Sequence, residues 1–174
     1  FMPEVIPTIS KEDIDTLCTY TYAQRASYIM GLYLDEYKDI LPALCEKAYS
    51  EERFGKDPAV LSKIYDNFSV MELWHGPTCA FKDMALQIMP RLLSRALKMT
   101  GEEKTALILV ATSGDTGKAA LEGYRDVPGI AIKVFYPVHG VSKVQKLQMA
   151  TQEGENVSVC AIEGNFDDAQ NGVK

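Results

Sequence analysis

Two stretches of the sequence carry residue types that could do chemistry, and the first is a lysine at a predicted helix start. Lys82 stands in "ELWHGPTCAFKDMALQ", where a loop of glycine, proline and threonine runs into a helical pattern. The helix dipole disfavours a cation at this position. A residue that breaks a local rule indicates either a solvated surface lysine or an amine with a function.

The surroundings expected for Lys82 favour a reactive amine. Phe81 and Trp74 would form an apolar wall beside it, so that partial desolvation adds to the effect of the helix dipole. A lysine whose ammonium form is disfavoured can form a Schiff base with an aldehyde. Pyridoxal phosphate (PLP) is the aldehyde cofactor most used by amino-acid enzymes. A solvated lysine is the alternative interpretation of Lys82 alone.

The second stretch, "ATSGDTGKAA", is a strand-to-helix turn that could bind an anion. Gly114 and Gly117 let backbone N–H groups approach a ligand closely, and the positive end of the following helix points outward. Hydroxyl groups add further donors from Thr112, Ser113 and Thr116. A tight turn required for its geometry alone is the alternative.

The spacing of the turn excludes the common nucleotide loops. A P-loop needs G-x-x-x-x-G-K-[ST], whereas two residues separate Gly114 from Gly117 and Ala119 follows Lys118. The dinucleotide fingerprint G-x-G-x-x-G is absent. Asp115 would also repel a bare polyphosphate. A carboxylate or a small zwitterion fits better, so the turn and Lys82 together predict a site for an amino acid and an aldehyde cofactor.

The elements expected around these stretches form an α/β fold in two regions. Residues 1–67 are predicted to be a helical N-terminal region, with Ser10 as a cap and Pro42 in the first turn of a later helix. Residues 68–174 alternate strand and helix, and a helix at 82–99 contains Pro90, which should bend it or move its start. Strands are expected at 69–74, 104–111, 130–137 and 156–164. This order predicts βαβ units and a parallel, doubly wound sheet.

The predicted sheet brings three loops to one edge, because ligands bind beyond the carboxyl ends of parallel strands. These loops are "HGPTCAFKD", "TSGDTGK" and "PVHGVSK". In the third loop, Ser142 and Lys143 either lie near an anion or form a helix cap and a solvated lysine. Lys82 and the glycine turn are therefore expected side by side.

The composition is that of an ordinary globular protein and excludes several function classes. The 174 residues are 47% hydrophobic and 24% charged, with a net charge of −6 and a pI near 5.0, which argues against nucleic-acid binding. No stretch is long and apolar enough to span a bilayer. Two histidines and four dispersed cysteines argue against a metal site and disulfides and predict a cytoplasmic protein. Cys79 could be a nucleophile but is better interpreted as a semi-buried filler.

Together, these stretches resemble the motifs of the threonine synthase family. "HGPTCAFKD" resembles the lysine motif of that family and "ATSGDTGKAA" resembles its carboxylate loop. "GVSKVQKLQM" and "GNFDDAQ" are similar to further segments of its longer microbial and fungal type, and the resemblance runs over nearly the whole chain. It implies PLP as cofactor and the fold that also serves cysteine synthase and the tryptophan synthase β subunit.

The resemblance implies a lyase that converts O-phospho-L-homoserine and water to L-threonine and phosphate. Lys82 would hold PLP as a Schiff base and, once freed by the substrate, would move protons at Cα and Cβ. The residues that would bind the substrate carboxylate or lie against the cofactor ring are Thr112, Ser113, Gly114, Asp115 and Thr116. Asp115 would lie near the 3′-oxygen of PLP. The expected partner is this small-molecule substrate, with no nucleic acid and no membrane.

The chain is much shorter than the members of that family. The loop for the cofactor phosphate, the residue facing the pyridine nitrogen and most of the substrate-phosphate site lie further downstream in the family. "EGNFDD" lacks the second glycine of such a loop, and Asp167 and Asp168 would oppose an anion, so we interpret it as a strand-to-helix turn. We therefore expect an N-terminal fragment that is inactive alone and binds PLP weakly or not at all.

Two other functions stay open. A related PLP-dependent lyase could eliminate phosphate from an O-phospho amino acid and release a keto acid without adding water, since the same motifs would serve it. A non-catalytic domain could use the turn at 112–118 only to bind an anion or a nucleotide. The sequence predicts neither the oligomeric state nor the regulation of the protein.

Overall fold

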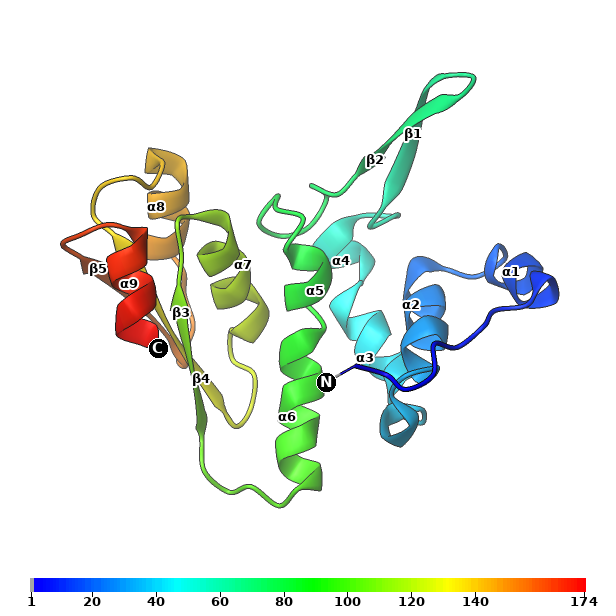
Figure 1. Ribbon diagram of the computed structural model, residues 1–174, viewed down its shortest axis with the longest axis horizontal. Helices are drawn as coiled ribbons and strands as arrows, with labels where there is room; N and C mark the ends of the chain where they lie inside the picture. Colours follow the sequence, from blue (N-terminus) through cyan, green and yellow to red (C-terminus); the bar gives the residue numbers. More distant parts are fainter. Residues whose placement is uncertain (1) are drawn as a thin grey trace. The chain divides into compact units, whose positions relative to one another are not determined.

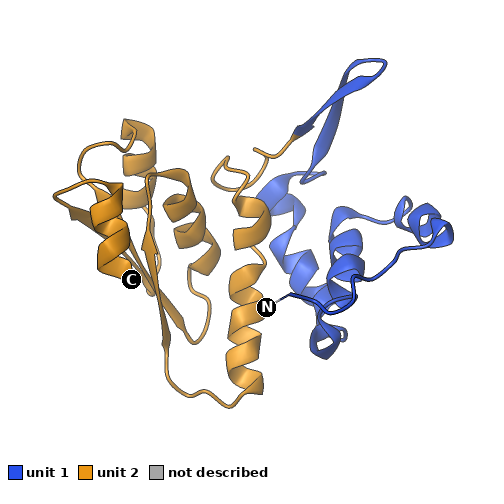
Figure 2. Ribbon diagram, in the orientation of Figure 1, with its two compact units in different colours: residues 1–71 blue, residues 72–174 orange. Residues whose placement is uncertain are grey.

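The computed structural model describes residues 2–174, and the chain divides into two compact units. One unit ends at Met71 and the other begins at Glu72 (Figure 2). Helices dominate the first unit, and strands alternate with helices in the second (Figure 1). The mixed α/β class predicted from the sequence is therefore confirmed.

Short capped helices fill most of the first unit. Its helical elements are α1 (Lys11–Leu17), α2 (Tyr22–Gly31), the 3₁₀ turn η1 (Asp35–Tyr37), α3 (Leu41–Ala48) and α4 (Glu51–Phe54). Ser10 and Thr21 open α1 and α2 with capping boxes, which satisfy backbone N–H groups that the helix leaves free. Pro42 lies in the first turn of α3, as predicted. The core of this unit includes Leu41, Cys45 and Phe54, all of them buried.

The sequence analysis did not predict the β-hairpin that follows these helices. β1 (Val60–Tyr65) and β2 (Phe68–Glu72) pair with each other in a two-stranded sheet of their own. The helical prediction for residues 1–67 is wrong over β1, and the strand expected at 69–74 does not join the parallel sheet. The missed signal is the pair Asp66–Asn67 between two β-rich runs, because a two-residue connection of this kind is typical of a hairpin.

The second unit is a parallel three-stranded sheet with helices on both faces (Figure 1). Its elements are α5 (Asp83–Leu86), α6 (Met89–Met99), β3 (Ala106–Ala111), α7 (Asp115–Tyr124), β4 (Ile130–Pro137), α8 (Lys143–Ala150), β5 (Val157–Ile162) and α9 (Phe166–Val173). The strand order is β3–β4–β5, with Ala106 opposite Ile130 and Ile132 opposite Val157. The predicted parallel sheet and its βαβ units are confirmed.

Two helix boundaries in this unit follow from single residues. The helix expected at 82–99 is divided into α5 and α6, and Pro90 lies in the first turn of α6, where its missing N–H is not needed. Asn165 and Asp168 form a capping box that opens α9. The interpretation of "EGNFDD" as a strand-to-helix turn is thus confirmed.

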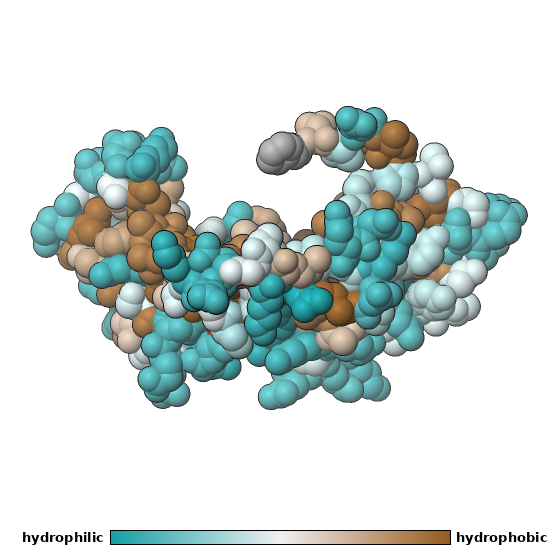
Figure 3. Space-filling view, turned by 90° about the horizontal axis from the view of Figure 1, so that it is seen from below, coloured by the Kyte–Doolittle hydropathy of each residue, from teal (hydrophilic) through white to brown (hydrophobic). Residues whose placement is uncertain are grey.

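Alternate residues of β4 form the centre of the core in the second unit. Ile130, Ile132 and Val134 are buried against Leu121 and Tyr124 of α7. Each such side chain contributes about 1.5–3 kcal/mol to stability when fully buried. The opposite face of the sheet is covered less completely, and apolar side chains reach the surface of this unit (Figure 3). Among residues 2–174, no helix is both long and apolar enough to cross a membrane.

Candidate functional site

The lysine loop and the glycine turn do not share a sheet edge, contrary to the prediction. The strand before Lys82 is β2, which pairs with β1. Of the three predicted loops, therefore, only those at 112–114 and 138–142 follow strands of the parallel sheet. The prediction failed because an apolar strand pattern does not reveal which sheet the strand joins. The two stretches are linked through helices instead, because α5 begins directly after Lys82 and α7 begins directly after Gly114.

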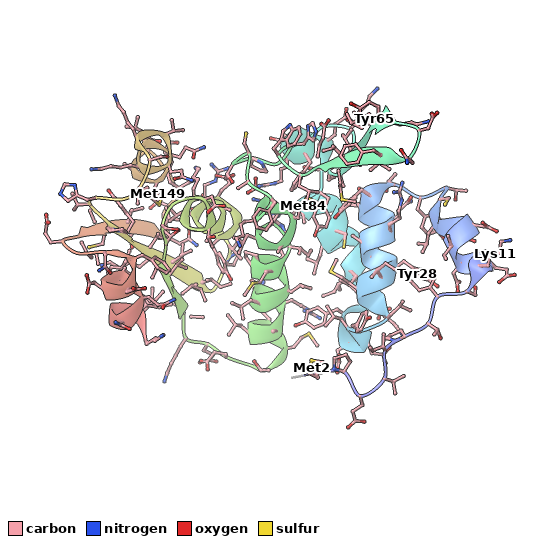
Figure 4. The ribbon with its side chains drawn as sticks, turned by 45° about the horizontal axis from the view of Figure 1, so that its top comes forward. Met2, Lys11, Tyr28, Tyr65, Met84 and Met149 are labelled. Atoms are coloured by element: carbon pink, nitrogen blue, oxygen red, sulfur yellow. The ribbon has the colours of Figure 1, made fainter. Side chains whose placement is uncertain are left out.

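Close packing of α5 on α7 joins these helices. A Cβ on Gly123 of α7 would overlap the backbone oxygen of Leu86 at the end of α5, so the helices approach more closely than any side chain would allow. In Figures 1 and 4, α7 lies between α5, marked by Met84, and α8, marked by Met149. The turn at the start of α7 is thereby tied to the helix that carries Lys82 at its N-cap.

Lys82 is half-buried, and its Nζ lies 4.5 Å from the centroid of the Phe81 ring. An ammonium group over a ring face is attracted to it. The predicted apolar wall is not closed, because Phe81 is 57% exposed and Trp74 is 53% exposed. Trp74 stacks instead on His75, with ring centroids 5.8 Å apart. These two aromatic residues therefore do not provide the desolvation that the sequence analysis expected.

A buried carboxylate fixes the loop in which Lys82 lies. Asp83 is fully buried, and its Oδ2 and Oδ1 accept hydrogen bonds at 2.8 Å from the backbone N–H and the hydroxyl of Thr78. We call this pair of hydrogen bonds the Thr78–Asp83 clasp. Burial raises the pKa of the Asp83 carboxyl above its ordinary value, and the hydrogen bonds from Thr78 oppose that rise. Cys79 inside the loop is exposed, not semi-buried as predicted, and its φ of 58° is uncommon for a residue with a side chain.

Thr112 holds the glycine turn from the inside. Its hydroxyl oxygen accepts hydrogen bonds from the N–H groups of Gly114 at 3.0 Å and Gly117 at 2.9 Å, and Thr112 is 2% exposed. A Cβ on Gly117 would overlap the methyl group of Thr112, so only glycine lets the helix start this close to β3. Two N–H groups expected to meet an anion are thus engaged within the turn, and Thr112 shapes the turn whether or not it also meets a substrate.

The outer side of the turn keeps donors that a carboxylate could use. Across residues 2–174, no hydrogen-bond acceptor lies in place for the backbone N–H groups of Ser113 and Asp115. Ser113 is exposed, and the Asp115 Oδ1 accepts the N–H of Thr116 at 2.9 Å. These groups stand at the N-terminus of α7, where the helix dipole favours an anion. The outer side of the turn could therefore bind a carboxylate, and this role stays a prediction.

The helix α8, which follows the third predicted loop, contributes a side chain that did not stand out in the sequence. Gln145 of α8 lies directly against Gly114, whose φ is 154°, so that a Cβ there would overlap the amide of Gln145. Ser142 accepts the N–H of Gln145 at 3.2 Å and caps α8, which is the second of its two interpretations. Gln145 could not be predicted as a neighbour of Gly114, because no local spacing connects the two residues.

The sequence analysis also missed a pair of side chains, His75 and Glu72, that lies before the clasp in the chain. His75 Nε2 is 2.8 Å from Glu72 Oε2, and both side chains are partly buried.

Within the described part of the chain, no group of three His, Cys, Asp or Glu side chains could hold a metal ion. The residues present fit the covalent end of an aldehyde cofactor, because a half-buried lysine stands on an ordered loop that is linked to an anion-binding turn.

Comparisons with known proteins find relatives over the whole chain. It is 41% identical over 181 aligned residues to threonine synthase of Pseudomonas aeruginosa and 36% identical over 177 to threonine synthase-like 2 of Xenopus laevis. The alignments cover 100% of this chain but only 37% of each relative, so the chain spans little more than a third of their length. No family model matches the chain.

Solved structures agree with the sequence relatives. A PLP-bound threonine synthase from Brucella melitensis superposes with a TM-score of 0.89 at 34% identity, and the yeast threonine synthase superposes with a TM-score of 0.88 at 33% identity. Each match covers 98% of this chain and 36% of the solved chain. The fold of the chain is therefore that of the corresponding part of these proteins.

Proposed function

We propose a function from the premise that this chain, over its whole length, belongs to the threonine synthase family. The protein that contains it would convert O-phospho-L-homoserine and water to L-threonine and phosphate, with PLP bound through Lys82. The observation that carries this proposal is the packing of α5 on α7, which links the lysine loop to the anion-binding turn. A cytoplasmic location, expected from the dispersed cysteines, is likewise a proposal.

In the proposed reaction, Lys82 and the residues of the turn at 112–116 have different roles. When bound, PLP supplies an electron sink that lets an amino acid lose protons from carbon. The Lys82 amine is the group that can bond the aldehyde and, once free, move protons at Cα and Cβ. The backbone N–H groups of Ser113 and Asp115 and the hydroxyl of Thr116 would bind the substrate carboxylate. Gly114, which has no side chain, leaves room for Gln145 beside the turn.

A lyase that never adds water is the second candidate. The lysine loop and the turn at 112–116 would serve either reaction, because both need an amine that bonds the aldehyde and donors for a carboxylate. We favour threonine formation because the Pseudomonas aeruginosa relative, 41% identical to this chain, carries the name threonine synthase.

The role of Lys82 is tested by replacing it in the full-length protein. Lys82→Ala should abolish both activity and the covalent attachment of PLP, because no other amine stands in this loop. Lys98→Ala, an exposed lysine at the end of α6, is the matched control and should behave as the wild type. Borohydride reduction followed by peptide mapping gives the attachment site. A label on any other lysine, or full activity of Lys82→Ala, would refute the assignment.

The outcome of the reaction is tested separately by product analysis. Wild-type protein with O-phospho-L-homoserine should release phosphate and L-threonine in equal amounts. Release of phosphate with ammonia and a keto acid, without threonine, would establish the lyase alternative. Binding of an anion without release of phosphate would favour the non-catalytic domain.

A further inference from the structure

The Thr78–Asp83 clasp encloses the residue that the proposed chemistry depends on. Asp83 directly follows Lys82, and Thr78 lies four residues before it, so the two hydrogen bonds close a short loop around the lysine. Asp83 is 0% exposed and Thr78 is 6% exposed, whereas Lys82 between them is only half-buried. The residue on the C-terminal side of Lys82 is thus held inside the protein, while Lys82 itself stays partly exposed.

The clasp contains two hydrogen bonds, whereas a helix cap can be made with one. A backbone donor and a side-chain donor of the same residue, Thr78, reach the two separate oxygens of Asp83, each at 2.8 Å. Hydrogen bonds to a charged group are about twice as strong as neutral ones. They hold Cys79 in a left-handed conformation that costs about 1–3 kcal/mol. The loop is therefore kept in one conformation that a free chain would avoid.

The clasp is also connected to the helix that carries the anion-binding turn. Burial lowers the pKa of Lys118 on α7 below its ordinary value, and the charges of Glu122 and, more weakly, Asp83 oppose that fall. The α5 helix that Asp83 opens ends against Gly123 of α7. A change at Asp83 would therefore alter the position of Lys82 relative to the turn at 112–116.

We propose that Asp83 is a positioning residue that, through Thr78, holds the Lys82 amine where it can bond the cofactor aldehyde. This inference rests on the proposed function. In this role Asp83 does not contact the reacting atoms, because its carboxylate is fully buried and both of its oxygens accept hydrogen bonds from Thr78. Its effect is on the rate at which Lys82 forms the Schiff base.

The test uses paired variants of the full-length protein freed of PLP. Thr78→Val removes the hydroxyl donor while keeping the shape of the side chain, and Thr78→Ser restores that donor. Asp83→Asn places an amide donor against the donors of Thr78. Asp168→Asn is the matched control, since this carboxylate also accepts a backbone N–H at 2.8 Å but opens α9.

The readout is the rate of Schiff-base formation after PLP is added, followed by absorbance, together with the thermal midpoint of each apoprotein. We expect Thr78→Val and Asp83→Asn to slow this rate by about tenfold or more, and Thr78→Ser to restore it within about threefold of wild type. Asp168→Asn should keep the wild-type rate and lose less thermal stability than Asp83→Asn, because this carboxylate is exposed. If Asp83→Asn does not fold, the Val and Ser variants of Thr78 decide the test.

Two outcomes would overturn the inference in distinguishable ways. Wild-type rates in Thr78→Val and Asp83→Asn, with the label still on Lys82, would show that the clasp serves only folding, and the proposed function would stand. Absence of a label on Lys82 in the wild-type protein would overturn the proposed function itself, and the role of Asp83 with it.

Discussion

Asn156 joins three segments of the second unit through a single side chain. Its Nδ2 donates hydrogen bonds to the backbone oxygens of Tyr124 and Ile130, each at 2.8 Å, and its Oδ1 accepts the N–H of Asp126 at 2.7 Å. These partners lie 26–32 residues earlier in the chain. Asn156, which directly precedes β5, thus connects this strand to the end of α7 and the start of β4.

Replacing Asn156 by alanine should lower the free energy of unfolding by about 2–3 kcal/mol, because three hydrogen bonds of about 1 kcal/mol each are lost. Urea unfolding of the full-length protein measures this change. Asn171→Ala, which changes an exposed residue of α9, is the control and should change stability by less than about 0.5 kcal/mol. Equal effects of the two changes would contradict the role assigned to Asn156.

At the scale of elements, the contact between α5 and α7 depends on a glycine that a helix would otherwise avoid. Gly123→Ala should destabilise the protein by about 1–3 kcal/mol, since the new methyl group must push away the Leu86 backbone. Gly172→Ala in α9 is the opposite case, because nothing lies within 4 Å of its Cβ position, and alanine should be neutral or slightly stabilising there. Urea unfolding compares them, and the absence of a difference would refute the close approach.

Gly123→Ala should also slow Schiff-base formation at Lys82 if α5 sets the position of the lysine loop. The added methyl group displaces the end of α5, whereas the Thr78–Asp83 clasp stays intact at its start. The rate should therefore fall less than in Thr78→Val. In the double variant, the loss in rate should equal the product of the two single losses within about threefold. A larger loss in Gly123→Ala than in Thr78→Val would mean that helix packing, and not the clasp, determines the position of Lys82.

The elements that the sequence predicted well are those fixed by local signals. Continuous apolar runs predicted β3, β4 and β5, and cap residues such as Ser10 predicted helix starts. The pairing of β2 with β1 was missed because the choice of sheet depends on contacts that no local pattern contains. In the candidate site, Lys82 and the turn at 112–116 stood out by residue type, whereas Asp83 and Gln145 have roles only through partners brought close by folding.

At the scale of the whole molecule, the two units carry separate cores whose buried groups titrate at alkaline pH. Cys45 belongs to the first unit and is 0% exposed, and burial, with Glu46 nearby, raises its pKa to about 11. Tyr124 belongs to the second unit, and burial raises its pKa above the ordinary value of 10.0. The first unit should therefore lose stability at a lower pH than the second.

The sign follows from linkage, because a group with a raised pKa in the folded state favours folding only while it stays protonated. The contribution of Cys45 is fully present below pH 9.0 and is lost as the pH rises through about 11, with a maximum of about 2–3 kcal/mol. Cys45→Ala should be less stable at pH 8 because it leaves a cavity, but its stability should fall less between pH 8 and 10.5. Cys18→Ala, which removes an exposed thiol, should keep the wild-type slope. Urea unfolding followed by circular dichroism at both pH values measures these slopes, and parallel curves for wild type and Cys45→Ala would show that the buried thiol does not limit alkaline stability.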